Sequence, residues 1–134
     1  MAKKPLLLVV AGAIFDNNNR VLLAKRPIGS MMAGLWEFPG GKIEPEETPE
    51  QALKRELFEE LNIIVEEKDL KPLSFTSYEY DKFHLLMPLF SCKTWEGTPI
   101  PKEKQELLFV AVKDINKFDM PPADLVLLKA FKNL

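Results

Sequence analysis

The stretch that decides the fold is residues 40–63, GGKIEPEETPEQALKRELFEELNI, because it contains the most clearly bounded helix in the chain. Thr48 is a suitable N-cap, Pro49 suits the first helical position, and Gln51 follows the cap by three residues, as in a capping box. Asn62 suits the end of the helix, because asparagine tolerates the left-handed backbone conformation. We therefore predict a helix over residues 49–61.

One face of this predicted helix carries three carboxylates. At about 100° per residue, Glu56, Glu59 and Glu60 fall within an arc of roughly 100°. The apolar positions of the adjoining arc, suited to packing on a sheet, are Leu53, Leu57 and Leu61. Clustered carboxylates repel one another, but they are the hard oxygen ligands that Mg²⁺ or Mn²⁺ takes. The alternative is a solvated acidic face on an amphipathic helix.

Residues before the helix favour a ligand site over a solvated face. Gly40-Gly41 allows the backbone to approach a ligand or a metal closely. The side chains of Lys25, Arg26 and Lys42 can reach phosphate oxygens beyond such metals. The pattern predicts a polyphosphate held through divalent cations.

The remaining sequence predicts strands around two helices. Residues 6–15 and 20–26 flank the turn at residues 16–19 and predict a hairpin, followed by a loop over residues 27–34. Further strands are expected at residues 73–80, 83–93 and 107–112. A C-terminal helix is expected over residues 123–134, with Leu125, Leu128 and Phe131 on one face. These elements predict an α+β or layered α/β domain.

The bulk composition limits the classes of protein. The chain has 134 residues, which suits one domain over residues 1–134, and its net charge of −2 argues against nucleic-acid polymers as partners. A single cysteine, Cys92, excludes an internal disulfide. The apolar run at residues 6–10 is soon interrupted, so neither a signal peptide nor a membrane span is expected. We expect a cytoplasmic protein.

The spacing around the helix resembles the Nudix box, the signature of the Nudix hydrolase family. The residues that carry it are Gly41, Glu47, Arg55-Glu56-Leu57, Glu59-Glu60 and Asn62-Ile63. The sequence departs from the family pattern at Asn62, where the family has glycine. Because asparagine is the next best residue for a left-handed cap, the expected cost is a few tenths to about 1 kcal/mol. Residues 35–44, 94–97 and 121–124 extend the resemblance to the MutT branch.

This resemblance implies an α/β/α sandwich around a mixed β-sheet. It also implies magnesium-dependent hydrolysis of an oxidised nucleoside triphosphate, such as 8-oxo-dGTP, to the monophosphate and pyrophosphate, which cleanses the nucleotide pool and prevents mutation. One alternative is the same chemistry on a modified pyrimidine triphosphate, such as 5-hydroxy-dCTP or 5-methyl-dCTP. Another is a non-catalytic nucleotide-binding module. The expected partner is a small molecule, neither nucleic acid nor membrane, and the protein is expected to be a monomer or weak dimer.

The resemblance also assigns roles to residues. The expected metal ligands are the Gly40 carbonyl and the carboxylates of Glu56, Glu59, Glu60 and Glu103. Either Glu56 or Glu103 is the expected base, although Glu103 could equally be an exposed loop residue. Glu47 and Arg55 are expected to brace the loop and the helix. The residues expected to contact substrate are Arg26, Glu37, Phe38, Pro39, Gly40, Gly41, Lys42 and Asp124.

Two of these assignments have alternatives, and one affects the choice of base. Phe38 either stacks on the base or belongs to the core, and Arg26 either contacts phosphate or caps a strand end. Asp124 stands where the best-known branch member has asparagine, and a carboxylate only accepts hydrogen bonds unless it is protonated. Met31 and Phe83 are further departures from the branch in this region. Together these departures leave the preferred base open.

Overall fold

The strands form two sheets in the computed structural model, which describes residues 4–132. A four-stranded sheet has the order β4-β1-β6-β5, and a three-stranded sheet has the order β3-β2-β7. The strands are β1 (Leu6–Ile14), β2 (Arg20–Lys25), β3 (Trp36–Glu37), β4 (Gly40–Lys42), β5 (Lys71–Glu79), β6 (His84–Cys92) and β7 (Glu106–Ala111). The helices are α1 (Pro49–Leu61) and α2 (Pro122–Leu127), with 3-10 helices η1 (Glu67–Asp69), η2 (Val112–Lys117) and η3 (Leu128–Phe131).

The four-stranded sheet is mixed, because β1 has one parallel and one antiparallel neighbour. β1 runs parallel to β6, with Ala11 opposite Leu89, and antiparallel to β4, with Val10 opposite Gly41. β5 then pairs antiparallel with β6. A mixed sheet with helices on both sides confirms the predicted α+β class, and a smaller antiparallel sheet accompanies it.

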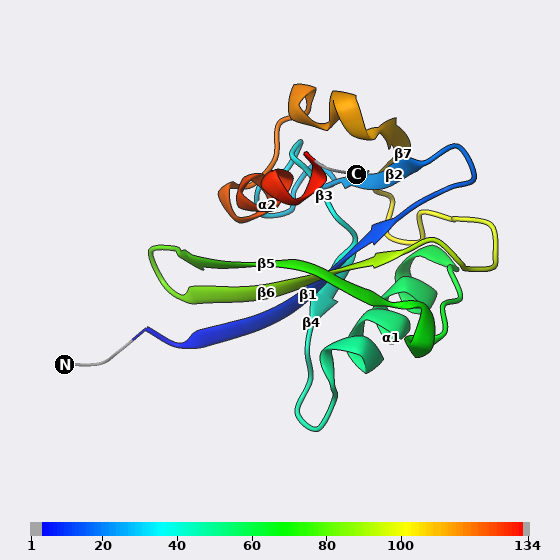
Figure 1. Ribbon diagram of the computed structural model, residues 1–134. Coiled ribbons are helices and arrows are strands. Elements are labelled where there is room, and N and C mark those ends of the chain that lie inside the picture. The colour runs from blue at the N-terminus through cyan, green and yellow to red at the C-terminus, as the bar shows by residue number, and fades with distance from the viewer. Residues whose placement is uncertain (1–3, 133–134) are drawn as a thin grey trace.

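The side chains of β1 alternate between the two faces of the sheet and contribute to a hydrophobic cluster on each face. Val10 and Ile14 face α1 and pack with its buried residues, Ala52, Leu53, Leu57 and Leu61. Ala11 and Ala13 belong to the opposite cluster, which α2 and η3 cover. Figure 1 shows α1 and α2 on different sides of the long strands. Burial of each leucine contributes roughly 1.5–3 kcal/mol, so α1 is firmly fixed on the sheet.

The predicted hairpin between residues 6–15 and 20–26 is wrong as a strand pair. The turn forms, with the Asp16 carboxylate accepting from the backbone N–H groups of Asn18 and Arg20. Beyond it, however, only Phe15 and Val21 form an isolated bridge. β1 pairs with β4 and β6, whereas β2 pairs with β3 and β7. Both strands lie where expected, but distant segments supply their partners.

The predicted C-terminal helix is shorter, and its buried face differs. α2 ends at Leu127, and η3 continues to Phe131; residues 133–134 lie outside the described part. The buried apolar residues are Ala123, Leu127 and Phe131, spaced four apart, whereas Leu125 is 48% exposed. The prediction that Leu125 shares the buried face is therefore wrong. Pro122 begins the helix, and Ala123, Leu127 and Phe131 join the cluster that packs on the sheet.

The other predicted elements are confirmed within one or two residues at most boundaries. β5 and β6 pair as expected, and β7 lies at residues 106–111. Within residues 4–132, no helix is both long enough and apolar enough to span a bilayer.

Candidate active site

Local capping signals set the first and last residues of α1, which lies beside the edge strand β4. The Thr48 side chain accepts from the Gln51 backbone, and the Gln51 side chain accepts from the Thr48 N–H, so the predicted capping box is present. Asn62 closes the helix with a φ of 59°, as expected for a left-handed cap. The helix therefore begins and ends at the predicted residues, and its polar face lies next to Gly40-Gly41 of β4.

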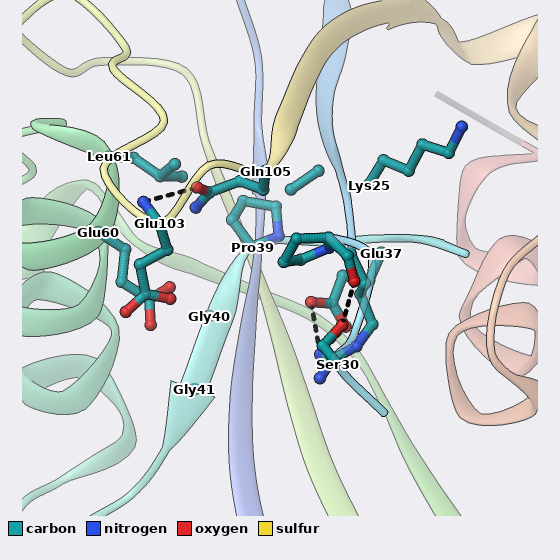
Figure 2. A pocket seen from close by; sticks show the side chains of 13 residues that line it. Lys25, Ser30, Glu37, Pro39, Gly40, Gly41, Glu60, Leu61, Glu103 and Gln105 are labelled. Carbon is teal, nitrogen blue, oxygen red and sulfur yellow. Dashed lines mark hydrogen bonds and ion pairs between the residues drawn. The ribbon is translucent and has the colours of Figure 1, made fainter. Parts of the chain in front are cut away.

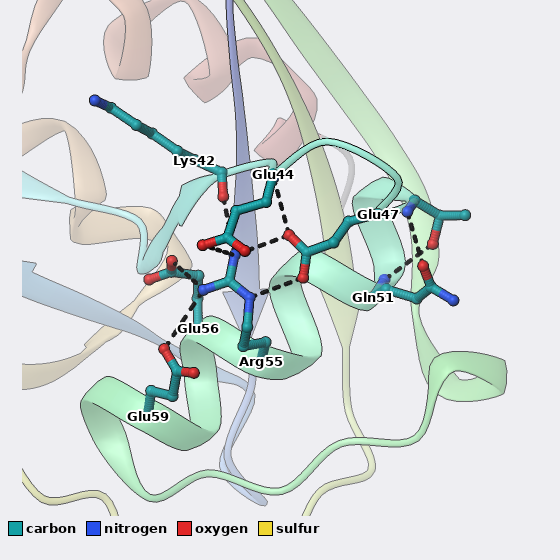
Figure 3. A network of polar contacts seen from close by, with 8 residues as sticks. Lys42, Glu44, Glu47, Gln51, Arg55, Glu56 and Glu59 are labelled. Atoms are coloured by element: carbon teal, nitrogen blue, oxygen red, sulfur yellow. Dashed lines mark hydrogen bonds and ion pairs between the residues drawn. The ribbon is translucent and has the colours of Figure 1, made fainter.

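Arg55 gathers carboxylates from the helix and from the loop before it (Figure 3). Its guanidinium donates to both Glu47 oxygens at 2.8 and 2.9 Å, and to Glu56 at 2.8 Å. It also lies 3.4 Å from Glu59 and donates to the Lys42 carbonyl at 3.2 Å. These contacts fix the loop to the helix, the arrangement expected if Glu47 and Arg55 are braces.

The hydrogen bonds of the Arg55 network shift the pKa values of Glu47 and Arg55. The bonds from Arg55, with a further bond from the Glu44 N–H, lower the pKa of Glu47 to about 2. The pKa of the Arg55 guanidinium is in turn raised, chiefly by Glu47 and opposed by burial. Both groups therefore stay charged at neutral pH.

The two glycines of β4 allow a close approach that a side chain would block. A Cβ on Gly41 would overlap the Glu56 carboxylate, so that carboxylate lies directly against the strand backbone. A Cβ on Gly40 would meet the Val10 carbonyl of β1. Both positions require glycine for steric reasons; the close approach is to Glu56 and to β1, and the predicted approach to a ligand or metal stays a prediction.

Glu60 and Glu103 point toward one another across a cavity of about 310 Å³ (Figure 2). Glu60 comes from α1 and Glu103 from the loop before β7. The pKa of Glu60 is raised to about 8, first by burial, then by hydrogen bonding and charge from Glu56, and by the charges of Glu103 and Glu37. The lining residues are Ala24, Lys25, Arg26, Pro27, Ser30, Glu37, Pro39, Gly40, Gly41, Glu60, Leu61, Glu103 and Gln105. The cavity thus concentrates negative charge beside bare backbone.

This charge fits a hard divalent cation. Carboxylates that share a partly desolvated site repel one another, and a cation among them would remove the repulsion that raises the pKa of Glu60. Glu59 does not join them in this conformation, because its carboxylate turns toward Arg55. Between residues 4 and 132, no three Asp, Glu, His or Cys side chains are gathered closely enough to chelate an ion as they stand. The chemistry of these donors, carboxylate oxygens beside a backbone carbonyl, is nevertheless the chemistry that a hard divalent cation prefers.

Arg26 and Glu37 line the same cavity as an ion pair. An Arg26 guanidinium nitrogen donates to both Glu37 oxygens, at 3.0 and 3.2 Å, and its Nε donates to the Met31 carbonyl. The pKa of Glu37 is raised, because burial outweighs the opposing charge of Arg26. Arg26 therefore links the loop at residues 27–34 to β3 and still faces the cavity.

Asp124 faces two further cavities on the other side of Glu37. It is 6% exposed, and its carboxylate accepts from the Phe38 N–H at 3.1 Å. The pKa of Asp124 is raised to about 7, chiefly by burial and then by the charge of Glu37, while the Phe38 N–H opposes the rise. One cavity, of about 210 Å³, includes Lys42 and Gly41, and the other, of about 170 Å³, includes Met31 and Phe83.

The Phe38 ring belongs to the core, so the second of its two alternatives holds and the ring does not stack on a base. Phe38 is 3% exposed, and its ring stacks on that of Phe131 with the ring centroids 5.4 Å apart. Its backbone N–H donates to the Asp124 carboxylate, which lines the cavities. Lys25 and Lys42 each line one of the cavities, but the Lys25 Nζ lies over the Trp36 ring at 5.8 Å, and the Lys42 side chain extends away from the Arg55 network.

Two residues at the site were not anticipated. Tyr80 lines the cavity beside Asp124, and its hydroxyl accepts from the Ala123 N–H at 3.3 Å. Gln105 lines the cavity with Glu103 and accepts from the Glu103 N–H at 2.9 Å. No local signal marks either residue. Tyr80 directly follows β5, and it lies beside Asp124 because α2, more than 40 residues later, packs against this strand.

The remaining titratable residues of interest are structural. Cys92 is buried, its Sγ donates to the Thr94 carbonyl, and burial raises its pKa. His84 lies 2.6 Å from the Ser77 hydroxyl on the β5–β6 pair. Neither side chain lines the cavities around Glu60 or Asp124.

A model of the NUDIX domain family matches residues 10–130 of the sequence. The chain belongs to the Nudix family. It is therefore a Nudix hydrolase, and the predicted family and enzyme class are confirmed. An "8-oxo-dGTP diphosphatase" of Proteus vulgaris is 44% identical over 72% of this chain and 85% of that protein.

Other similar proteins carry different names. The "CTP pyrophosphohydrolase" of Escherichia coli (strain K12) is 36% identical, over 96% of this chain and 93% of that protein. Among solved structures, the solution structure of the E. coli ORF135 protein superposes with a TM-score of 0.85 at 35% identity. The superposition covers 98% of this chain and 91% of the ORF135 chain. The fold of this Nudix hydrolase is thus shared over almost its whole length.

Proposed function

We propose that this Nudix hydrolase cleaves a modified nucleoside triphosphate, such as 8-oxo-dGTP, to the monophosphate and pyrophosphate, with Mg²⁺ as its cofactor. The observation that supports this most directly is that Glu60 hydrogen-bonds to Glu56, which lies against Gly41, and shares a cavity with Glu103 and the Gly40-Gly41 backbone. The same cavity includes Arg26, a cation suited to a phosphate oxygen. Removal of such nucleotides would cleanse the nucleotide pool and prevent mutation.

The residues proposed to hold the ion are Glu56, Glu60, Glu103 and Glu59, with the Gly40 carbonyl. A bound Mg²⁺, or Mn²⁺ in its place, would neutralise phosphate charge and make water more acidic. Either Glu103 or Glu56 accepts the proton of the attacking water. Glu56 is held in place by Arg55, whereas Glu103 approaches from a separate loop.

Arg26 and the β4 backbone are proposed to orient the phosphate chain. Arg26 is already anchored to Glu37 and to the Met31 carbonyl, so little side-chain freedom is lost when it binds phosphate. The other substrate-contacting residues proposed are Pro39, Gly41, Lys42 and the Phe38 backbone. These residues touch the phosphates and the sugar, and do not select the base.

Asp124 is proposed to select the base. A carboxylate with a pKa near 7 accepts hydrogen bonds when charged and donates one when protonated, so it suits a purine ring N–H, a purine carbonyl or a cytosine amino group. The similarity to a CTP pyrophosphohydrolase supports modified pyrimidine triphosphates as the second candidate. The non-catalytic alternative has no support, because the matched relatives are named as hydrolases and the box carboxylates are present.

Further expectations accompany this proposal. We propose a cytoplasmic enzyme formed by one domain, acting as a monomer or weak dimer on a small molecule. The net charge of −2 disfavours tight binding to a nucleic-acid polymer.

A nucleotide panel tests the substrate. The values of kcat/KM for 8-oxo-dGTP, dGTP, 5-hydroxy-dCTP, 5-methyl-dCTP and CTP are compared at one Mg²⁺ concentration by pyrophosphate release. We expect an oxidised purine to exceed dGTP by at least about tenfold, which corresponds to one or two base contacts. A preference for a modified pyrimidine would instead support the second candidate, and no turnover with any nucleotide would refute both.

The Glu60→Gln variant tests the metal site. We expect a loss in kcat of at least about 100-fold, because a cation ligand is removed. Since the pKa of Glu60 is raised first by burial and then by neighbouring carboxylates, the same variant should be more stable than the wild type at pH 8 without added metal. The matched control is Glu50→Gln in the first turn of α1, which should change neither property. Near-normal activity of Glu60→Gln would remove Glu60 from the site.

A further inference from the structure

The loop that carries Glu103 is docked on the last turn of α1. The Ile100 N–H donates to the Leu61 carbonyl at 2.8 Å, and the Lys102 N–H donates to the Glu60 carbonyl at 3.1 Å. Upstream, Ile64 and Glu96 exchange two backbone hydrogen bonds of 2.9 Å. The end of the helix is therefore the surface against which this loop is positioned.

Two backbone hydrogen bonds lie within the loop itself: the Lys102 N–H donates to the Ile100 carbonyl at 2.9 Å, and the Lys104 N–H donates to the Pro101 carbonyl at 3.2 Å. Pro99 and Pro101 have no N–H to donate, and Lys104 has a left-handed backbone with a φ of 62°. The Glu103 N–H is satisfied by the Gln105 side chain, and no described hydrogen bond or ion pair holds the Glu103 carboxylate. The position of that carboxylate therefore depends on the path of the loop backbone.

Asn62, where the family has glycine, holds this loop by its side chain. Its backbone N–H closes α1 by donating to Phe58 at 3.2 Å, as any residue with this conformation can. Its side-chain Nδ2 also donates to the Thr98 carbonyl at 3.2 Å, which a glycine cannot do. The neighbouring Gly97 packs so closely that a Cβ there would meet the Asn62 carbonyl. The two segments are therefore in direct contact.

We propose that Asn62 is a positioning residue: its bond to the Thr98 carbonyl restrains the loop at residues 98–104 and thereby keeps the Glu103 carboxylate opposite Glu60. This inference rests on the proposed function, in which Glu103 acts at the metal or as the base. The departure from the family pattern then has a use, because asparagine caps the helix as glycine does and also restrains the loop.

A second restraint limits how much one substitution can do. The Lys102 Nζ donates to the Phe58 carbonyl at 3.3 Å and lies over the Phe58 ring at 5.2 Å. Loss of the Asn62 bond therefore loosens the loop but does not release it. A solvent-accessible hydrogen bond of this kind changes a local equilibrium by about three- to tenfold, and this sets the expected size of the effect.

The kinetic test is Asn62→Gly, which keeps the left-handed cap and removes only the restraint. We expect kcat to fall about three- to tenfold, with KM for the nucleotide changed less than about twofold, because Arg26 and Glu37 are untouched. In a Glu103→Gln background, Asn62→Gly should have no further effect. The matched control is Asn19→Gly, which makes the same substitution at a left-handed position in the β1–β2 turn and should leave kcat unchanged.

Hydrogen exchange tests the restraint without catalysis. The amides of Ile100, Lys102 and Lys104 should exchange about three- to tenfold faster in Asn62→Gly, and those of α1 should not. Unchanged exchange would overturn the restraint even if activity fell. If exchange is faster but kcat is unchanged, the link to Glu103 is overturned. The link is also overturned if Asn62→Gly lowers kcat equally in the wild type and in the Glu103→Gln background. Faster exchange in a protein that hydrolyses no nucleotide would preserve the restraint but refute the proposed function and any catalytic purpose of the restraint.

Discussion

The buried carboxyl of Asp124 should make stability depend on pH in a way that one substitution abolishes. Its pKa is raised from 3.8 to about 7, chiefly because burial penalises the charged form. A raised folded-state pKa means that the protonated group stabilises the fold at low pH, and that this stability is lost as the pH rises through 7. Asp124→Asn has no proton to lose, so it lacks this pH dependence.

The size of the effect follows from the two pKa values. The full shift, about three pKa units at 1.36 kcal/mol each, corresponds to about 4 kcal/mol across the whole range. Most of the loss falls between pH 5 and pH 8. Over that interval, the unfolding free energy of the wild type should fall by about 2.5 kcal/mol relative to that of Asp124→Asn.

Urea unfolding at pH 5, 6, 7 and 8, without metal or nucleotide, measures this difference. The fluorescence of Trp36 and Trp95 and the far-ultraviolet circular dichroism follow the transition, and coincident curves establish two-state behaviour. Shifted groups that are not coupled to Asp124, such as Glu60, titrate in both proteins and cancel in the difference. If the difference between wild type and Asp124→Asn changes by less than about 0.5 kcal/mol from pH 5 to pH 8, Asp124 does not titrate in this range and the reasoning is wrong.

Three further changes have defined outcomes. Gly41→Ala should displace the Glu56 carboxylate and lower kcat by about 10- to 100-fold with an unchanged circular dichroism spectrum; full activity would show that Glu56 need not lie against the strand. Leu57→Ala should lower the unfolding free energy by about 2–5 kcal/mol, measured in urea, because Leu57 is fully buried between α1 and the sheet. Glu47→Gln should lower stability at pH 7 but not near pH 2: the lowered pKa of Glu47 stabilises the fold above pH 4.5, and this is lost as pH falls to about 2. An equal thermal shift at both pH values would contradict the ion pair with Arg55.

The sequence predicted α1 to the residue because its boundaries are local. Thr48 and Gln51 form the capping box, and Asn62 adopts the left-handed conformation without help from distant residues. The carboxylate face follows from helical spacing, so Glu56 and Glu60 lie together as expected. Glu59 differs because a rotamer depends on neighbouring charges, and Arg55 attracts it.

Features that depend on distant contacts could not be predicted from the sequence. The apolar pattern shows that residues 20–25 form a strand but not that β7 is their partner, because strand pairing is set by tertiary packing. Burial of Asp124 arises where α2 meets β3, so its altered pKa has no local signal. The Phe38 ring is equally apolar in the core or against a base, and only its contact with Phe131 decides between them.

The network around Arg55 has a consequence for the life of the molecule in a cell. A single guanidinium offsets much of the negative charge at the start and middle of α1, so a newly made chain can assemble this scaffold before any cation arrives. If the proposed ion is needed for turnover but not for folding, magnesium shortage would leave an intact, dormant pool of protein. Restored supply would then return activity without new synthesis.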